Sequence, residues 1–448
     1  MQKKIYITVV LSFFLVLIVS AQQFNQDHLS FDDAIEYAFQ NAPKLRIQEL
    51  KTEQEKERLT QIKREYIPEV YVSSDLRRNI IIPTTPIPAF MINPDASQDE
   101  LMYMRFNTPW SAATGVNMTF DIFNPKTAGR QSEQKKELAI SNIDTQLTKN
   151  ELRAEVAQAY IDCIIADEQL NSLASDTLYF FSRLQEQQKL FSKGKIDNVE
   201  KNEAIINYNN ALERYMRGKS ISYDARLNLL LVMGHDGNSS PENNLVLTDN
   251  IESLYRNLIV ERNFNKVSSL TESKMIEQIG LAQLKTQHEK LKYLPTLSLT
   301  GYYGANYFGR NINLTESNKW FGNSFLALSL QIPITRSFST AKGVTQFKLR
   351  ELVEQENLRT YQNNFTNSLL RDMNDFENLV QSYRLKLSNM ELQTQNLSSR
   401  QAEYDLGHIT DSQLLNEKLN EQQIRQDFLQ ASYEVLSAYI RLEKLMNQ

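Results

Sequence analysis

Side chains able to do covalent or metal chemistry are few in this sequence and lie far apart. One cysteine, Cys163, excludes an intrachain disulfide and a multi-cysteine metal site. It lies on an apolar helical stripe, where packing explains it better than a nucleophilic role. The histidines show no H-E-x-x-H spacing: they are His28, His235, His288 and His408. No Walker loop, G-x-S-x-G or G-x-G-x-x-G sequence occurs. We therefore expect no enzyme, no bound metal and no cofactor.

The composition indicates few, long structural elements. The chain has 448 residues with 49 basic and 54 acidic side chains, and a net charge of −5 is of the wrong sign for a nucleic-acid binder. Hydrophobic residues make up 41% and charged residues 23%, which argues against wholesale disorder. Only 13 glycines and 11 prolines occur, about half the usual frequencies. Compact α/β enzymes need more turn residues than this.

The first residues read as an export signal. Lys3 and Lys4 precede the apolar run 5–19, and small residues follow at 19–21. We expect residues 1–21 to be a cleaved signal peptide, with an uncleaved membrane anchor as the alternative. No later stretch of 18 or more apolar residues follows, so any membrane-spanning segments beyond the signal would have to be β-strands.

The remaining chain repeats itself. Three segments recur in the same order at offsets of about 210 to 227 residues: 66–72 with 293–299, 115–122 with 325–332, and 191–196 with 404–409. The only two tryptophans, Trp110 and Trp320, fall in register with this repeat. Chance similarity between coiled coils would not align prolines, glycines and tryptophans. We predict a duplication with structural repeats 24–237 and 238–448.

Each repeat is predicted to contain a long antiparallel helical hairpin. Residues between Pro125 and Pro241, and all residues after Pro333, lack proline. Apolar residues there recur at alternating steps of four and three, the coiled-coil period: Val156, Tyr160, Cys163, Leu170, Ala174, Thr177, Phe181 and Leu184, then Phe428, Ser432, Val435, Tyr439, Leu442 and Met446. Gly194 and Gly407 interrupt the two tracts. Helix-start signals follow both glycines, at Asp197 with Glu200 and at Thr410 with Gln413.

Period-two segments predict four strands, near 68–78, 113–123, 295–308 and 322–334. Their apolar and polar residues alternate, and aromatic residues gather near their ends. Such strands match a membrane barrel, and four of them cannot close one. We therefore expect oligomerisation, with three copies giving twelve strands. The proline-rich segment 77–109 is predicted to be an extracellular loop, with 309–319 as its counterpart.

Together these residues resemble the TolC family of outer-membrane efflux proteins. Leu29–Pro43 reads LSFDDAIEYAFQNAP, close to the family opening L-[ST]-x-x-x-A-[IL]-x-x-A-x-x-x-N-P, although Ala42 interrupts the final Asn-Pro. The helix-to-strand joint recurs as Ile67-Pro68 and Leu294-Pro295. Strand-to-helix joints lie at 122–130 and 332–334, the second without the family's glycine pair. Tyr404–Leu415 reads YDLGHITDSQLL, the family's hairpin segment.

The resemblance implies a mainly α fold with a membrane β-barrel. A homotrimer would place a twelve-stranded barrel in the outer membrane, among its lipids, on an α-helical tunnel that extends into the periplasm. It also implies a passive exit duct of a tripartite efflux or type I secretion system, joined by a periplasmic adaptor to an inner-membrane transporter. The alternative is a secreted periplasmic coiled-coil scaffold or adaptor that never enters the membrane, which would not need duplicated period-two strands.

Site residues follow from the same resemblance. A periplasmic gate is implied at Tyr404, Glu200, Gln413 and Asn416, where the last two replace common aspartates, so Glu200 alone would set the charge of the mouth. The predicted adaptor-contact tips are Gly194, Gly407, Lys193, Lys195 and Leu406. Trp110 and Trp320 are expected to be membrane-interface anchors. Ordinary helix-surface or loop-packing roles remain the alternatives for each set.

Overall fold

The computed structural model describes residues 28–95, 97–235, 245–260, 269–334 and 336–447. The predicted signal peptide lies outside these residues. The chain divides into two compact units. The helical unit comprises Met1–Gln48, Gln146–Leu270 and Asn364–Gln448, and the sheet unit comprises Glu49–Thr145 and Thr271–Asn363. Each unit draws on both halves of the sequence, so the compact units are not the two predicted repeats.

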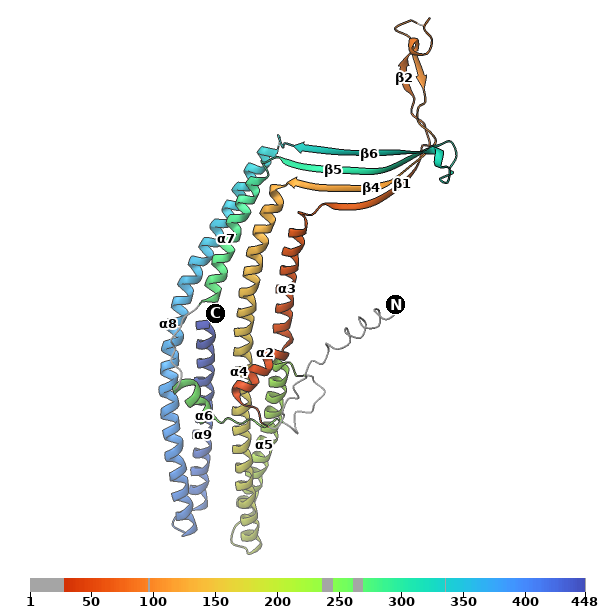
Figure 1. Cartoon of the computed structure of the whole chain (residues 1–448). Coiled ribbons are helices and arrows are strands. Elements are labelled where there is room, and N and C mark those ends of the chain that lie inside the picture. Colours follow the sequence, from red (N-terminus) through yellow and green to blue (C-terminus); the bar gives the residue numbers. More distant parts are fainter. Residues whose placement is uncertain (1–27, 96, 236–244, 261–268, 335, 448) are drawn as a thin grey trace, which may run out of the picture. The chain divides into compact units, whose positions relative to one another are not determined.

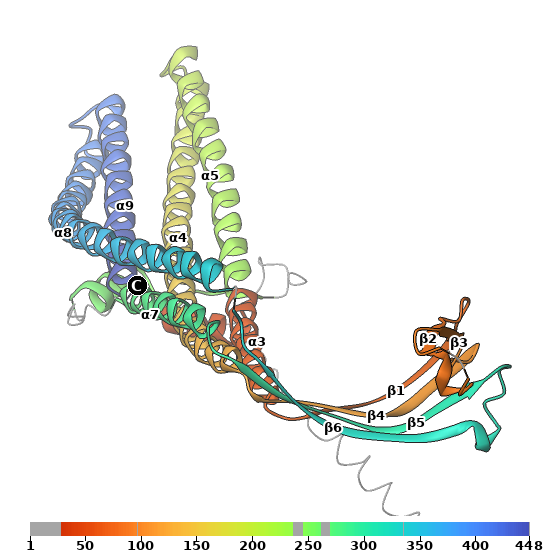
Figure 2. The ribbon, with the colours of Figure 1, turned by 90° about the horizontal axis from the view of Figure 1, so that it is seen from above.

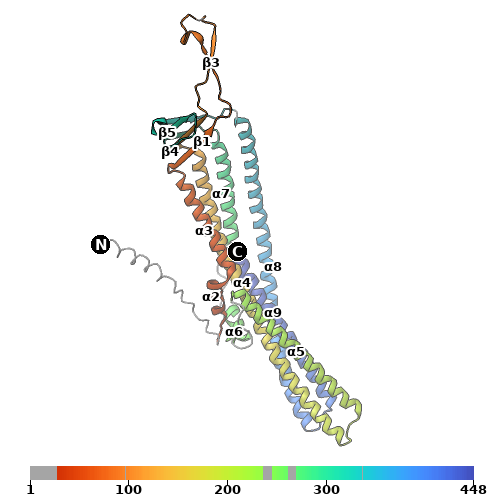
Figure 3. The ribbon, with the colours of Figure 1, turned by 90° about the vertical axis from the view of Figure 1, so that its right-hand side faces the viewer.

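Two antiparallel hairpins dominate the helical unit. In the first, α4 (Pro125–Ser192) is followed by α5 (Asn198–Met233), and in the second, α8 (Arg336–Asp405) is followed by α9 (Asp411–Asn447). Each pair runs side by side (Figure 3). None of the helices in the described part of the chain combines the length and the apolar character needed to cross a membrane.

Glycines close both hairpins, as predicted. Gly194 has φ 67° and Gly407 has φ 76°, the left-handed region that other residues adopt at a cost. A Cβ added at either position would meet no atom within 4 Å, so backbone conformation, not crowding, requires glycine. The predicted helix starts are confirmed. Asp197 accepts hydrogen bonds from the backbone amides of Val199 and Glu200 at the start of α5.

The core of the helical unit surrounds the middle of α4. Val156, Tyr160 and Cys163 are fully buried there. The Tyr160 hydroxyl lies 2.9 Å from both the Leu29 carbonyl and the Asp249 carboxylate, and burial raises its pKa. The helices α2 (Phe31–Asn41) and α6 (Ile251–Tyr255), and the π-helix η2 (Arg256–Val260), contribute the other walls. The predicted apolar stripe of α9, from Phe428 to Met446, is buried throughout and is confirmed.

Nearer the tip, one member of the predicted stripe of α4 is wrong, whereas Leu184 is buried as predicted. Phe181 is 42% exposed, whereas Phe180 is 3% exposed. The buried positions include two polar side chains, Asp176 and Gln187, beside Leu173, Phe180 and Leu184. Asp176 pairs with Lys418 on α9, and a pattern based on apolar residues alone could not select a buried carboxylate.

The sheet unit is built on four antiparallel strands. They are β1 (Glu69–Arg78), β4 (Trp110–Phe123), β5 (Thr296–Gly309) and β6 (Trp320–Gln331), in the order β1-β4-β5-β6. Figure 2 shows them side by side as one curved ribbon. These bounds overlap the four segments with period two. The helices of this unit are α7 (Leu270–Leu291) and the neighbouring parts of α3 (Pro43–Arg64), α4 and α8.

Strand register gives the sheet one apolar and one polar face. Val72 lies opposite Val116, which lies opposite Tyr303 on β5. The next residues along the strands face the other way, and the Asn117 amide donates to the Ser73 hydroxyl at 2.8 Å. The apolar face is open: Val72 and Leu326 are each 75% exposed. Among the described residues, the outer edges of β1 and β6 have no pairing strand.

Part of the segment predicted to be a loop is a second, two-stranded sheet. β2 (Thr85–Pro88) pairs with β3 (Leu101–Met104), and the short 3-10 helix η1 (Ala89–Met91) follows β2. Prolines cannot donate to a ladder, which is why the sequence predicted no strand, but an edge strand tolerates them. We name residues 80–106 the arm, and it leaves the end of the sheet where β1 finishes and β4 begins (Figure 1).

Candidate functional site

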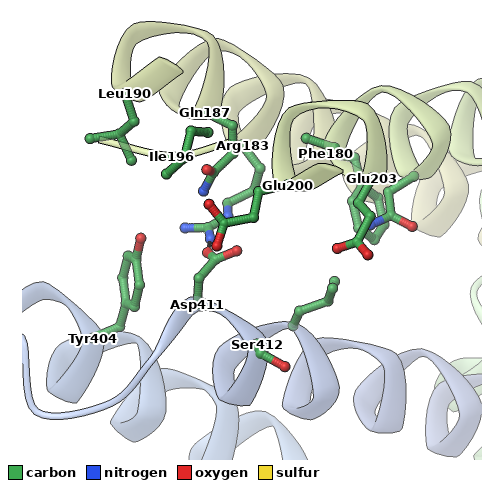
Figure 4. Close-up of a pocket in the computed structure, with 13 residues that line it drawn as sticks. Phe180, Arg183, Gln187, Leu190, Ile196, Glu200, Glu203, Tyr404, Asp411 and Ser412 are labelled. Carbon is green, nitrogen blue, oxygen red and sulfur yellow. Dashed lines mark ion pairs between the residues drawn. The ribbon is translucent and has the colours of Figure 1, made fainter. Parts of the chain in front are cut away.

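The tips of the two hairpins enclose the main candidate site, within the helical unit. Here the last turns of α4 and the first turns of α5 face the end of α8 and the start of α9 across a cavity of about 290 Å³ (Figure 4). Its lining comprises Phe180, Arg183, Gln187, Leu190, Ile196, Glu200, Glu203, Ala204, Asn207, Tyr404, Asp411, Ser412 and Leu415. We name it the tip cavity.

Arg183 connects the two hairpins at the centre of the tip cavity. Its guanidinium forms an ion pair with Asp411 on α9 and another, at 3.1 Å, with Glu186 on its own helix. The Tyr404 ring centroid lies 4.8 Å from the Arg183 Cζ, a cation–π distance. The Arg183 side chain is only 14% exposed, so water and salt screen its attractions to Asp411, Glu186 and Tyr404 less than they would on an open surface. Arg183 therefore holds the end of the first hairpin against the second.

More acidic than basic side chains line the tip cavity. Glu200, Glu203 and Asp411 line it together with one guanidinium. Carboxylates that converge on a concave surface attract cations and repel anions. Asp411 is already paired with Arg183, which leaves the two glutamates of α5 to set the local field.

Only part of the predicted gate meets in this cavity. Tyr404 and Glu200 line it, and the Tyr404 hydroxyl donates to Glu186 at 3.4 Å. Gln413 instead completes a capping box, because its Oε1 accepts from the Thr410 backbone amide at 2.8 Å. Asn416 is exposed on α9 and is not among the lining residues.

Arg183 and Asp411 were not selected from the sequence. A usable signal did exist, since Arg183 is the only basic residue between Arg153 and Lys189. A single cation on a helix rich in carboxylates indicates a specific partner. Asp411 follows the capping residue Thr410 and reads as an ordinary acidic residue in a first helical turn.

The predicted tip residues surround the two glycine turns. Lys193 and Lys195 are exposed beside Gly194, and within the described part of the chain neither forms an ion pair. Leu406, beside Gly407, is 71% exposed. An exposed leucine and two free lysines leave both turns open to a partner.

A group of four charges, three of them buried, lies between α4 and α9, farther from the tips. We name it the ionic layer: Asp176, Lys418, Glu421 and Arg425. The Lys418 Nζ is 2.8 Å from Asp176 Oδ1 and 2.8 Å from Glu421 Oε2, while Arg425 pairs with Glu421. Burial lowers the pKa of Lys418, and the hydrogen bond to Asp176 opposes that shift. Each charge has an opposite partner, so the layer fixes how α4 and α9 lie together.

In the sheet unit, Trp110 and Trp320 lie at the same end of the sheet. Trp110 begins β4 opposite Gly309, and Trp320 begins β6 opposite Tyr307. The Arg78 guanidinium lies 5.4 Å from the Trp110 ring, and the Trp320 indole donates to the Leu314 carbonyl at 2.9 Å.

Among the described residues, no group of three His, Cys, Asp or Glu side chains could hold a metal ion.

Comparisons with known proteins address the fold. No protein-family model and no curated protein matches the sequence. Among solved structures, the CmeC outer membrane channel of Campylobacter jejuni superposes with a TM-score of 0.73 at 14% identity, over 93% of this chain and 85% of that one. The open-state MtrE outer membrane channel of Neisseria gonorrhoeae gives a TM-score of 0.69 at 14% identity, covering 93% and 88%. The outer membrane protein VceC of Vibrio cholerae gives 0.63 at 12%, covering 93% of each chain.

This chain has the outer membrane channel fold. The TolC-family resemblance drawn from its motifs is confirmed at the level of the fold. Identities of 12–14% are too low to carry activity or cargo across, so function rests on the residues of this chain.

Proposed function

We propose that the protein is one subunit of a TolC-family outer-membrane exit duct. The observation that carries this proposal is the four-stranded sheet in a chain with the outer membrane channel fold. The sheet has one exposed apolar face and one polar face, and within the described ranges its two edges are unpaired. Unpaired backbone groups are costly in lipid, and three copies joined edge to edge close a twelve-stranded barrel without edges. The apolar face then meets lipid, and the polar face lines a watery lumen.

The hairpins serve as the periplasmic tunnel in this proposal. Their tips, at Gly194 and Gly407 with Lys193, Lys195 and Leu406, dock a periplasmic adaptor that links the duct to an inner-membrane pump. The duct is passive, and the pump selects the cargo and supplies the energy of a tripartite efflux or type I secretion system. Trp110 and Trp320 anchor the barrel at a membrane–water interface.

The tip cavity is the gate of the mouth. The bond between Arg183 and Asp411 holds the two hairpins of one subunit together in the closed state, with the Tyr404 ring over the guanidinium. Glu200 and Glu203 give the mouth its charge, while Gln413 and Asn416 contribute only dipoles. Opening then requires the Arg183 bonds to break.

Planar-bilayer recording of the purified trimer tests the duct and the gate together. Asp411→Asn should raise single-channel conductance, because Arg183 loses its charged partner across the hairpins. Glu200→Gln should lower cation selectivity without changing assembly. Arg217→Ala is the control, since it removes only an exposed ion pair with Glu213 on one helix.

Two results would contradict the proposal. A water-soluble monomer that leaves bilayers non-conducting would favour the periplasmic scaffold instead. Trimers that conduct, but whose conductance is unchanged in Asp411→Asn and whose selectivity is unchanged in Glu200→Gln, would retain the duct and remove the gate. Fractionation with the outer membrane, resistant to salt extraction, is the expected cellular result.

A further inference from the structure

Two exposed apolar surfaces lie at the same end of the sheet, one beside each of its outer strands, β1 and β6. The first is the base of the arm, where the chain leaves β1 and returns to β4. Ile80 is 91% exposed, Ile81 is 86% exposed and Phe106 is 62% exposed. These three large apolar side chains lie at the two ends of the arm, which the hydrogen bond from the Asn79 amide to the Pro109 carbonyl holds together, and such exposure at one place is unusual.

The second surface is the turn between β5 and β6. We name residues 308–321 the turn platform, and its exposed apolar side chains are Phe308 (44%), Ile312 (48%), Leu314 (43%) and Phe321 (57%). The rings of Phe308 and Phe321 are 6.2 Å apart, so they form one patch.

Hydrogen bonds make the turn platform a fixed shape. The buried Tyr307 hydroxyl donates to the Asn311 carbonyl at 2.9 Å and accepts from the Asn313 amide at 3.1 Å. The Trp320 indole donates a hydrogen bond to the Leu314 carbonyl. A turn ordered in this way can receive a partner without a large loss of conformational entropy.

Within one subunit the two surfaces do not cover each other. Ile80 and Ile81 follow β1 at one edge of the sheet, and Phe321 lies on β6 at the other edge. β4 and β5 lie between these two strands, which separates β1 from β6 by roughly 14 Å at the usual strand spacing. The high exposures of Ile80, Ile81 and Leu314 show that neither surface is buried by the same chain.

The arm also needs a partner on physical grounds. Its sheet has two strands of four residues, and Pro86 and Pro88 remove two donors from β2. An isolated two-stranded hairpin is marginally stable in water. Apolar contact with another surface would stabilise it.

We propose that the arm base of each subunit packs on the turn platform of the next copy of this chain. Edge-to-edge addition of copies brings β1 of one subunit beside β6 of its neighbour, and both apolar surfaces lie at the same end of those strands. The contact is head-to-tail, so it repeats around a closed ring and forms an apolar collar at the arm end of the barrel. This inference rests on the proposed trimer.

Disulfide trapping in the full-length trimer tests the contact. In a Cys163→Ala background, the paired variants Ile81→Cys with Leu314→Cys, and Ile80→Cys with Ile312→Cys, are oxidised and run on non-reducing gels. Covalent dimers and trimers that a reductant dissolves are expected from at least one pair. The matched control is Ile81→Cys with Ile332→Cys, because Ile332 is equally apolar and 62% exposed but lies past the other end of β6; it should stay monomeric on the gel.

A thermodynamic cycle provides the second measurement. Phe106→Ser and Leu314→Ser should each lower the temperature at which the trimer dissociates in detergent, by several degrees, and the double variant should lose less than the sum. Conducting trimers in which both cysteine pairs fail to link and the two serine substitutions are additive would overturn the collar. Self-linkage of Ile81→Cys alone would overturn it in favour of arm-to-arm packing. If no trimer forms at all, the proposed duct fails instead.

Discussion

At the scale of single residues, buried charges set the strongest constraints in the helical unit. Asp176 and Lys418 are each less than a tenth exposed, and both depend on a partner on the other helix. Removing one member of a buried ion pair leaves the other charge desolvated, whereas replacing both with apolar groups of similar size is often tolerated. The ionic layer therefore specifies how α4 and α9 pair more than it adds to stability.

This reasoning predicts an asymmetric double-mutant cycle. Lys418→Met should destabilise the helical unit by up to about 3–5 kcal/mol, because Asp176 and Glu421 lose their shared buried cation and keep only the less buried Arg425, which lies 3.7 Å from Asp176. Adding Asp176→Leu should recover much of the loss, since Arg425 remains to pair with Glu421. Thermal unfolding followed by far-ultraviolet circular dichroism gives the three midpoints. Lys219→Met, at an exposed lysine of α5, is the control and should leave the unfolding midpoint unchanged. A double variant that is less stable than Lys418→Met would contradict the argument.

Cys163 supports a second prediction at this scale. It is fully buried, and burial, assisted by the nearby Asp167 charge, raises the pKa of its thiol to about 12. The reactive thiolate is therefore nearly absent at pH 8. We expect no reaction with a disulfide reagent in the native protein and one equivalent per chain after denaturation. Rapid native labelling would show that the core around Tyr160 opens.

At the scale of elements, most of the fold could be predicted from sequence because each element has its own period. Proline and glycine positions predicted the ends of helices and strands, and the alternation of Leu326, Leu328 and Leu330 predicted the apolar side of β6. The arm could not be predicted, since β2 has two prolines in four residues and owes its pairing to β3. The lining of the tip cavity could be predicted only in part. The isolated position of Arg183 on α4 marks it as unusual, but its partner Asp411 lies on another helix, and sequence alone does not pair such distant positions.

The hairpin turns give a prediction for elements. Gly407→Ala should destabilise the turn by roughly 1–2 kcal/mol, the cost of a left-handed backbone for a residue with a Cβ. Gly407→Asn should cost less, because asparagine tolerates that conformation. The amides of Gly407 and His408, which donate to the carbonyls of Tyr404 and Glu403 at 2.8 Å, should exchange with solvent roughly 5–30 times faster in the alanine variant.

Gly322→Ala is the matched control for this turn. A Cβ at Gly322 also meets nothing within 4 Å, but its φ is not positive. In Gly322→Ala, the backbone amides around residue 322 should therefore exchange with solvent as fast as in the unmodified protein. Equal effects of alanine at Gly407 and Gly322 would mean that open space, not backbone conformation, decides the tolerance of each site.

At the scale of the whole molecule, the two faces of the sheet differ in polarity, and in the proposed duct they meet different solvents. The apolar face carries Val72 and Leu326, each 75% exposed in the single chain. A soluble sandwich would cover such a face with a core, and a barrel subunit covers it with lipid. The polar face has hydrogen-bonding side chains such as Ser73 and Asn117, which suit water.

Neighbouring residues on β6 separate these possibilities. Leu326→Arg places a charge on the apolar face and should destabilise the membrane-inserted trimer by about 2–4 kcal/mol, the cost of arginine facing the bilayer core. Ala327→Arg places the same charge one residue along, on the polar face opposite Thr300, where it should leave assembly intact and shift ion selectivity toward anions. Heat-dependent dissociation of the trimer on gels measures the first effect and bilayer recording measures the second. Because the two variants differ only in the face that carries the charge, equal behaviour in both assays would mean that the sheet does not separate lipid from water.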